Sequence, residues 1–107
     1  MYIQMRFEWD DAKGSANQKK HGISFGFAAR IFDDPHCLFY ADRVDHKTAE
    51  LRWHAIGRAR IQPGRQIVLL VVHVYREDHH GEEIIRIISA RAAEKHDIRR
   101  YQEQEVE

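Results

Sequence analysis

Residues 66–76 read QIVLLVVHVYR and residues 83–90 read EIIRIISA, and the polar turn Asp78-His79-His80-Gly81 lies between them. Both stretches are rich in valine and isoleucine, which favours strands over helices. Two strands that are joined by so short a turn pair antiparallel. These two predicted strands therefore indicate a sheet that is built as a meander.

The sequence on either side extends this pattern. Residues 37–41 and 51–58 read as two more strands, with a turn at Pro63-Gly64, and residues 3–9 read as a first strand. Helices are predicted at residues 10–22, 24–34 and 92–104, with Asp10 and Ser24 as N-caps and Gly22 as a C-terminal glycine. The order β-α-α-β-β-β-β-α predicts the α+β class, with an antiparallel sheet and helices packed on one face.

The composition is typical of one compact domain, predicted to cover residues 1–107. The chain has 43% hydrophobic and 32% charged residues, and its formal net charge is zero, so bulk charge gives no indication of nucleic-acid binding. Cys37 is the one cysteine, which excludes an internal disulfide and predicts a reducing compartment, the cytoplasm. No stretch resembles a membrane helix or a signal peptide, so no membrane association is expected.

The strand at residues 51–58 carries charge at alternate positions. Side chains two residues apart share one face of a strand, so Arg52, His54 and Arg58 should project to the same side. Arginine is suited to two-pronged contacts with phosphate. The alternative is that these side chains simply solvate an open face of the sheet.

Arg86 interrupts an otherwise apolar run at residues 84–88. A charge in a buried strand requires a partner or a water-filled cleft, and an ion pair with Glu50 or Glu83 is the structural alternative. His73 lies in a valine-rich strand, where it is either a functional residue or a hydrogen-bonded core histidine. If His73 and the arginines converge on one face, they form a cationic groove that can hold a phosphodiester.

Several motifs occur in order along the chain, beginning with Trp9-Asp10-x-x-Lys13-x-x-x-Asn17-x-x-Lys20-His21-Gly22-Ile23-x-Phe25. They continue through Phe32-Asp33-Asp34-Pro35, Glu50-x-Arg52-Trp53, Ile56-Gly57 and Arg86-Ile87-Ile88-Ser89-Ala90-Arg91. Together these motifs span Arg6 to Tyr101 and resemble the BrnT family of toxins.

This resemblance implies a RelE-like fold and an endoribonuclease that is the toxin of a type II toxin–antitoxin pair and inhibits translation. It implies no metal ion and no other cofactor. The expected partners are the RNA substrate and a BrnA-type antitoxin, which neutralises the toxin. The complex would reach operator DNA only through the DNA-binding part of the antitoxin.

Metal-free RNA cleavage requires deprotonation of the 2′-hydroxyl, in-line attack on phosphorus and protonation of the leaving 5′-oxygen. A histidine is suited to proton transfer near neutral pH, and fixed cations can stabilise the extra charge of the transition state. The candidates for proton transfer are Lys20, His21 and His73. The candidates for charge stabilisation are Arg58, Arg76, Arg86 and Arg91. The candidates for RNA contact are Arg52, His54 and Tyr101, with helix packing as the alternative for Tyr101.

Two other functions remain open from the residues alone. The neutral net charge and the absence of a recognisable catalytic triad are compatible with a non-catalytic module that binds RNA or protein. The eight histidines and the cluster of Asp42, Asp45 and His46 are compatible with a metal-dependent nuclease.

Overall fold

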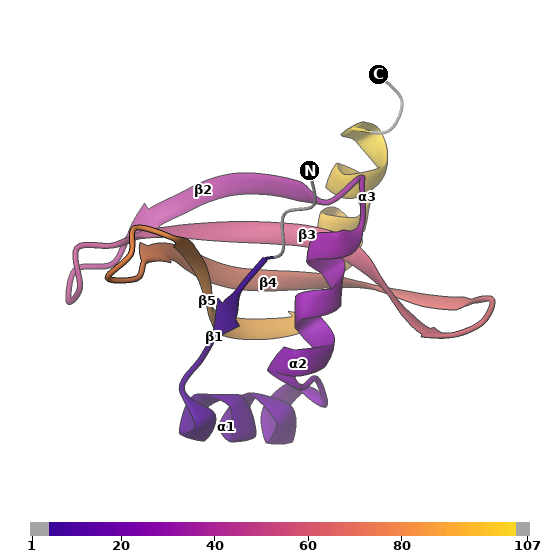
Figure 1. Cartoon of the computed structure of the whole chain (residues 1–107). Coiled ribbons are helices and arrows are strands. Elements are labelled where there is room, and N and C mark those ends of the chain that lie inside the picture. The colour runs from indigo at the N-terminus through magenta and orange to yellow at the C-terminus, as the bar shows by residue number, and fades with distance from the viewer. Residues whose placement is uncertain (1–4, 105–107) are drawn as a thin grey trace.

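A five-stranded sheet with the order β1-β5-β4-β3-β2 forms the centre of the computed structural model, which describes residues 5–104 (Figure 1). In chain order the elements are β1 (Phe7–Glu8), α1 (Asp11–His21), α2 (Phe25–Ala28), the 3₁₀ helix η1 (Ala29–Asp33), β2 (Leu38–Val44), β3 (Leu51–Gln62), β4 (Arg65–Glu77), β5 (Glu83–Ala92) and α3 (Lys95–Gln104). The predicted α+β class and the predicted order of elements are confirmed.

Strands β2 to β5 form the predicted meander, because each pairs antiparallel with the next. Strand β1 is the exception to the predicted antiparallel sheet, since it pairs parallel with β5 through Phe7 and Ile85. It is also shorter than predicted, and residues 3–4 of the predicted strand lie outside the described residues. The sheet is therefore mostly antiparallel, with one parallel edge.

The predicted helix caps form in the structure. The Asp10 side chain accepts a hydrogen bond from the backbone N–H of Lys13 at 3.0 Å, and that of Ser24 accepts from Phe27 at 3.1 Å. Gly22 ends α1 with a φ of 72°, the left-handed conformation that glycine adopts at low cost. These caps fix where α1 and α2 begin, and therefore where the chain turns onto the sheet.

The helices do not all pack on one face of the sheet, which corrects the prediction. Helices α2 and η1 bury Phe25 and Ile31 against one face, here called the η1 face, in a core with Val71 and Ile87. Helix α3 covers part of the opposite face, here called the α3 face, by packing Tyr101 onto residues that include Ile56 and Leu70. The sequence pattern of α3 indicated a helix, but it carried no information on which face the helix would cover.

Helix α3 crosses the α3 face from β5 to the far edge of the sheet. At its beginning, Asp97 accepts a hydrogen bond from Arg91 of β5 at 2.9 Å. At its end, Gln104 donates to the backbone carbonyl of His36, just before β2. The helix covers only the part of the sheet near Ile56 and Leu70, so the remainder of the α3 face is left open beside it.

Asn17 joins α1 to the sheet at β5. Its side-chain amide donates to the backbone carbonyl of Ala90 at 2.9 Å, and its side-chain oxygen accepts from the Ala90 backbone N–H at 3.1 Å. The side chain thus satisfies both backbone groups of a strand residue, as a neighbouring strand would. This contact fixes α1, and with it Lys13, relative to β5.

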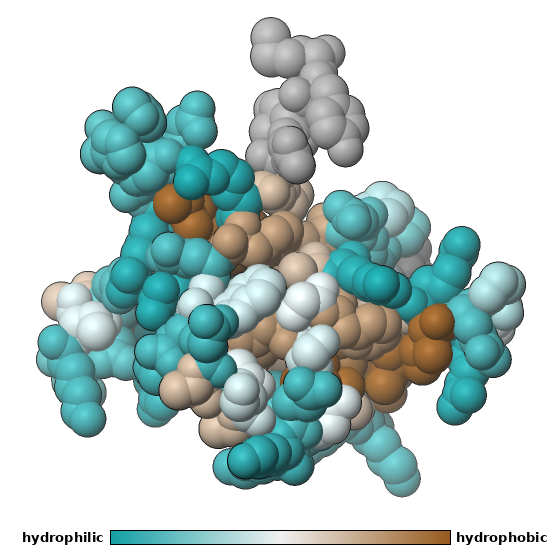
Figure 2. All heavy atoms as spheres, turned by 60° about the horizontal axis from the view of Figure 1, so that its bottom comes forward, coloured by the Kyte–Doolittle hydropathy of each residue, from teal (hydrophilic) through white to brown (hydrophobic). Residues whose placement is uncertain are grey.

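Hydrophilic side chains dominate the surface when the side that carries α1 is turned forward, and hydrophobic atoms show between them (Figure 2). Within residues 5–104, no helix is long and apolar enough to cross a membrane.

Candidate active site

A cationic cleft opens on the α3 face, at the end of the sheet where β5 begins. It encloses about 250 Å³ and is lined by residues of α1, the β2–β3 loop and strands β3, β4 and β5. Its lining residues are Lys13, Asp45, Lys47, Thr48, Glu50, Arg52, Val74, Arg76, Arg86 and Ile88. We call this surface the arginine cleft. The structure thus brings together Arg52, Arg76 and Arg86 of the predicted site.

Glu50 holds Arg76 in a two-pronged ion pair. The Nε and Nη2 atoms of Arg76 donate to the two carboxylate oxygens of Glu50 at 2.9 Å and 3.0 Å. These hydrogen bonds lower the pKa of Glu50 and raise that of Arg76, so both groups are held in their charged forms. The pair fixes the guanidinium at the wall of the cleft.

Arg86 pairs with Glu8 instead of with Glu50 or Glu83, the partners weighed from the sequence. One guanidinium nitrogen of Arg86 lies 3.4 Å from a carboxylate oxygen of Glu8, and a nitrogen of Arg76 lies 3.8 Å from the same oxygen. One carboxylate therefore lies between two arginines of neighbouring strands, which reduces the repulsion between them.

Arg52 is held by Asp45 of the β2–β3 loop, at 2.5 Å. The Asp45 carboxylate also accepts hydrogen bonds from backbone N–H groups of its own loop, and these hydrogen bonds are the main reason that its pKa is lowered. Lys13 and Lys47 add positive charge to the same lining. Cations therefore outnumber carboxylates in the cleft, although the whole chain is neutral.

Such an arrangement suits a phosphodiester. Arginines held in a fixed orientation offer paired N–H donors to phosphate oxygens, and they need no reorganisation when negative charge increases in a transition state. The side chains of Arg76 and Arg86 are 40% and 27% exposed, so a ligand can reach them.

His54 lies on the same face as Arg52, as strand alternation predicted. Its Nδ1 atom is 3.0 Å from the Tyr40 hydroxyl, and its Nε2 atom is 3.3 Å from a carboxylate oxygen of Asp42. The guanidinium of Arg100 stacks over the Tyr40 ring, 4.0 Å from its centroid. Tyr40 was not predicted as a site residue and Asp42 was considered only as a metal ligand, because their alignment with His54 depends on the β2–β3 register.

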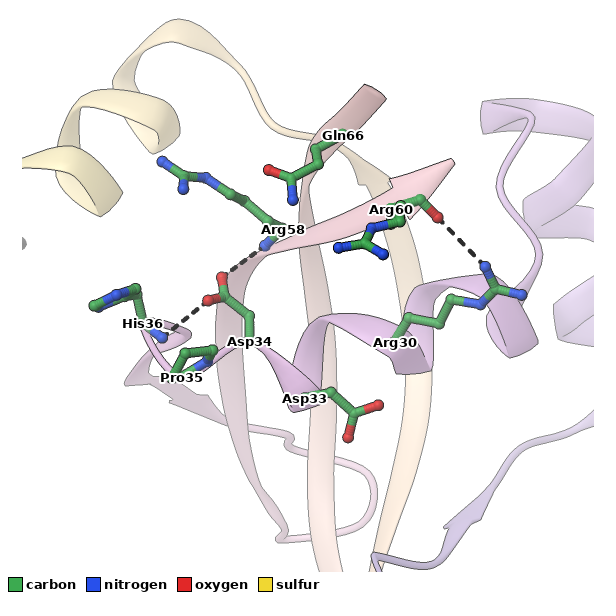
Figure 3. A pocket seen from close by; sticks show the side chains of 8 residues that line it. All are labelled: Arg30, Asp33, Asp34, Pro35, His36, Arg58, Arg60 and Gln66. Atoms are coloured by element: carbon green, nitrogen blue, oxygen red, sulfur yellow. Dashed lines mark hydrogen bonds between the residues drawn. The ribbon is translucent and has the colours of Figure 1, made fainter. Parts of the chain in front are cut away.

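Arg58 lies on the same face as Arg52 but outside the arginine cleft. The two residues are about 20 Å apart along β3, at about 3.3 Å per residue. Arg58 lines a second pocket of about 690 Å³ with Asp34 and His36 (Figure 3). The predicted group of Arg58, Arg76, Arg86 and Arg91 therefore does not converge on one point.

Asp34 is the centre of that second pocket. Its carboxylate accepts hydrogen bonds from the Tyr101 hydroxyl at 2.5 Å and from the backbone N–H groups of Arg58 and His36, each at 2.9 Å. Burial opposes ionisation of Asp34, but these hydrogen bonds hold its pKa below the usual range. The Asp34 carboxylate is thus held in its ionised form by hydrogen bonds from the protein itself. The guanidinium carbon of Arg58 lies 5.2 Å from the centroid of the Tyr101 ring.

Two predicted residues fix helix α3 to the sheet. Arg91 donates to Asp97 at 2.9 Å and lies 3.6 Å from Glu94. Tyr101 has no exposed surface and packs on Ile56, so it is a helix-packing residue, which was the alternative weighed for it. Their contacts in this structure are with the protein itself, away from the arginine cleft.

His73 lies on the η1 face, which corrects the expectation that it would join the arginines. A register shift between Val72 and His73 occurs in the β4–β5 ladder, and the imidazole is fully buried among aromatic rings, 5.1 Å from the Phe32 centroid. Burial lowers the pKa of His73 to about 4, and the nearby Val71 backbone opposes this lowering only in part. Neither ring nitrogen has a partner that meets hydrogen-bond geometry. A substrate on the α3 face cannot reach His73.

Lys20 and His21 are exposed in the last turn of α1. They do not line the arginine cleft, whereas Lys13, in the first turn of the same helix, does. Lys13 and Glu50 are site residues that the sequence reasoning missed, although both stand in the motifs quoted above. Their motif positions were the signal that could have identified them.

Among residues 5–104, no group of three or more histidine, cysteine, aspartate or glutamate side chains is arranged to hold a metal ion. Asp42 and Asp45, which were considered as ligands, contact His54 and Arg52 instead.

The sequence of the chain matches the model of a protein family. The family described as "Ribonuclease toxin, BrnT, of type II toxin-antitoxin system" matches residues 9–97. No curated protein matches the chain. The matched span includes every residue that lines the arginine cleft.

Proposed function

The chain belongs to the BrnT family of ribonuclease toxins of type II toxin–antitoxin systems, and we propose that its arginine cleft binds and cleaves RNA. Because the members of this family are ribonucleases, the protein is an RNA-cleaving enzyme, and the alternative of a non-catalytic binding module is excluded. A type II toxin also has a cognate antitoxin. The proposal concerns where and how the cleavage takes place.

One observation carries the location of the site. Cationic side chains from α1, β3, β4 and β5 line one cleft, and the family motifs supply Lys13, Arg52 and Arg86 to it from widely separated parts of the chain. Residues that are far apart in the sequence and meet at one cleft are well placed to act together. The second pocket, around Asp34, is lined by three arginines (Arg30, Arg58 and Arg60), against five cations in the arginine cleft, and the fold already satisfies its Asp34 carboxylate.

The proposed reaction is independent of metal ions. The ribose 2′-oxygen attacks the adjacent phosphorus, the bond to the 5′-oxygen breaks, and a 2′,3′-cyclic phosphate and a 5′-hydroxyl are formed. Arg76 and Arg86 stabilise the negative charge that gathers on the phosphoryl oxygens, as fixed donors do in other enzymes. DNA lacks the 2′-hydroxyl and is not a substrate.

Three further parts of the proposal concern the biology of the toxin. RNA cleavage in the cytoplasm stops translation, and a BrnA-type antitoxin reverses the effect by covering the arginine cleft. The cleft is a local concentration of positive charge on a neutral chain, so an acidic segment of the antitoxin fits it. The complex reaches operator DNA through the antitoxin.

The experiment compares Arg86→Ala with Arg65→Ala. Arg65 is the first residue of β4, at the opposite end of that strand from Arg76 and the arginine cleft. Its loss should therefore leave both growth arrest and RNA cleavage unchanged. We expect Arg86→Ala to slow cleavage about 100-fold or more and to relieve growth arrest, with a thermal midpoint close to that of the wild type. Full activity of a folded Arg86→Ala protein would place the reaction elsewhere.

A further inference from the structure

Tyr40, His54 and Asp42 form a chain of interacting groups on the α3 face. The imidazole lies between the Tyr40 hydroxyl, 3.0 Å from Nδ1, and the Asp42 carboxylate, 3.3 Å from Nε2. A ring nitrogen that faces a carboxylate carries the proton, so Nδ1 is the acceptor and the Tyr40 hydroxyl donates to it. The order carboxylate, imidazole, hydroxyl is the arrangement by which enzymes activate a hydroxyl group.

This chain of groups lies next to the arginine cleft. His54 and Arg52 point to the same face of β3, about 7 Å apart along the strand at about 3.3 Å per residue. Tyr40 and His54 are directly paired across β2 and β3, and both residues are half-buried. A phosphate held by Arg52 thus places its ribose within the neighbourhood of Tyr40.

Other elements add charge around this chain of groups. Arg100 of α3 stacks on the Tyr40 ring at 4.0 Å, which fixes the ring and places a positive charge beside it. His73 of β4 lies behind the sheet and interacts electrostatically with His54, and its pKa of about 4 means that it is neutral near pH 7. The charged groups around this chain of groups are Asp42, Arg43, which lies 3.8 Å from the Asp42 carboxylate, and Arg100.

We propose that Tyr40 is the general base of RNA cleavage and relays the 2′-hydroxyl proton to His54, while Asp42 positions the imidazole. The inference rests on the proposed function, because it requires the scissile phosphate in the arginine cleft. Tyr40 is the catalytic residue of this step, since its oxygen contacts the substrate. His54 and Asp42 act through it as positioning residues.

In the proposed step, the Tyr40 oxygen takes the proton of the 2′-hydroxyl as its own proton passes to Nδ1 of His54. The 2′-oxygen forms a bond to phosphorus, and the bond between phosphorus and the 5′-oxygen breaks. The leaving 5′-oxygen takes a proton from water, and the imidazolium returns one to the resulting hydroxide. No proton is gained or lost overall, and the Asp42 carboxylate stays ionised and offsets the charge of the imidazolium.

The first test is the rate of cleavage of a short single-stranded RNA by Tyr40→Phe, with Tyr75→Phe as the matched control. Tyr75 lies on β4 and contacts Trp53 and His73 on the η1 face, away from the cleft. We expect Tyr40→Phe to lower kcat about 100-fold or more and to change KM by less than about threefold. The control should keep the wild-type kcat.

The second test compares kcat and KM of His54→Gln and of Asp42→Asn with those of the wild type. His54→Gln keeps a hydrogen-bonding side chain but cannot accept the proton, so we expect kcat to fall about 100-fold or more and KM to change by less than about threefold. Asp42→Asn removes the carboxylate that positions the imidazole, so it should also lower kcat and leave KM nearly unchanged.

The outcomes separate the two proposals. If Tyr40→Phe cleaves RNA at the wild-type rate while Arg86→Ala does not, the relay is wrong and the arginine cleft stands. If both variants cleave at the wild-type rate, the location of the site is wrong as well. If Tyr40→Phe fails to fold, His54→Gln decides, and a wild-type kcat of that variant overturns the relay.

Discussion

The Glu50 carboxylate holds the Arg76 guanidinium by two hydrogen bonds of 2.9 Å and 3.0 Å, which join the end of the β2–β3 loop to the end of β4. The two side chains are 27% and 40% exposed, so the pair is in contact with water. Exposed ion pairs contribute under about 1 kcal/mol to folding. Its main effect is therefore to orient a guanidinium toward the cleft.

Replacing Arg76 by lysine tests this orientation. Arg76→Lys keeps the positive charge but loses the two-pronged geometry, so we expect RNA cleavage to slow at least about 10-fold with little change in thermal midpoint. Arg65→Lys is the control, because Arg65 lies at the other end of β4. Wild-type cleavage by Arg76→Lys would show that charge alone is required.

Tyr101→Phe removes the hydroxyl that donates to Asp34 and should reduce the free energy of unfolding by about 1–3 kcal/mol at pH 7. The pKa of Asp34 is lowered in the folded protein, so its ionised form stabilises the fold above about pH 4, and this contribution is lost as the pH falls through the lowered pKa. The difference between wild type and variant should therefore shrink in strong acid. Urea unfolding at pH 7 and at pH 3 measures this difference in the free energy of unfolding. An equal difference at the two pH values would contradict the stabilising role of the ionised Asp34.

His73→Leu should leave cleavage unchanged and reduce the sensitivity of the fold to acid. The imidazole titrates at about 4 in the folded protein against 6.5 as its ordinary value, so the unfolded chain binds the proton first. Stability from the neutral imidazole is full above about pH 6.5, and about 3 kcal/mol is lost as the pH falls to about 4. The variant should not show this loss in urea unfolding. A folded His73→Leu protein that does not cleave RNA would show that His73 takes part in the reaction.

Charge reversal in the cleft tests where the antitoxin binds. Arg52→Glu should abolish cleavage and weaken antitoxin binding, because charge pairs that are removed from water typically cost about 2–5 kcal/mol when one partner is lost. Affinity is measured by calorimetry on folded toxin, with Arg65→Glu as the control. Wild-type affinity combined with lost cleavage would mean that the antitoxin binds a surface outside the cleft.

Much of the fold could be predicted from the sequence, because the meander depends on local signals. Valine- and isoleucine-rich stretches, short turns and the caps Asp10, Gly22 and Ser24 fix the elements and their order. The side of the sheet that α3 covers depends instead on Tyr101 packing onto Ile56, a contact between distant segments. Local patterns carry no such information, so this prediction was wrong.

The candidate site was only partly predictable for the same reason. Strand alternation placed Arg52, His54 and Arg58 correctly on one face, because the strand period holds within β3. It could not say whether His73 of β4 shares that face with them, because that depends on the pairing of β4 with β3, where His73 lies opposite Trp53 on the η1 face. Partners such as Tyr40 follow from the β2–β3 pairing, which no single stretch of sequence specifies.

The most direct test of the central claim is an analysis of the ends produced when the purified protein cleaves single-stranded RNA in the presence of EDTA. The account predicts cleavage at the rate seen without EDTA, with 2′,3′-cyclic phosphate and 5′-hydroxyl ends, and no cleavage of DNA of the same sequence. Loss of activity in EDTA, or products with 5′-phosphate ends, would contradict it.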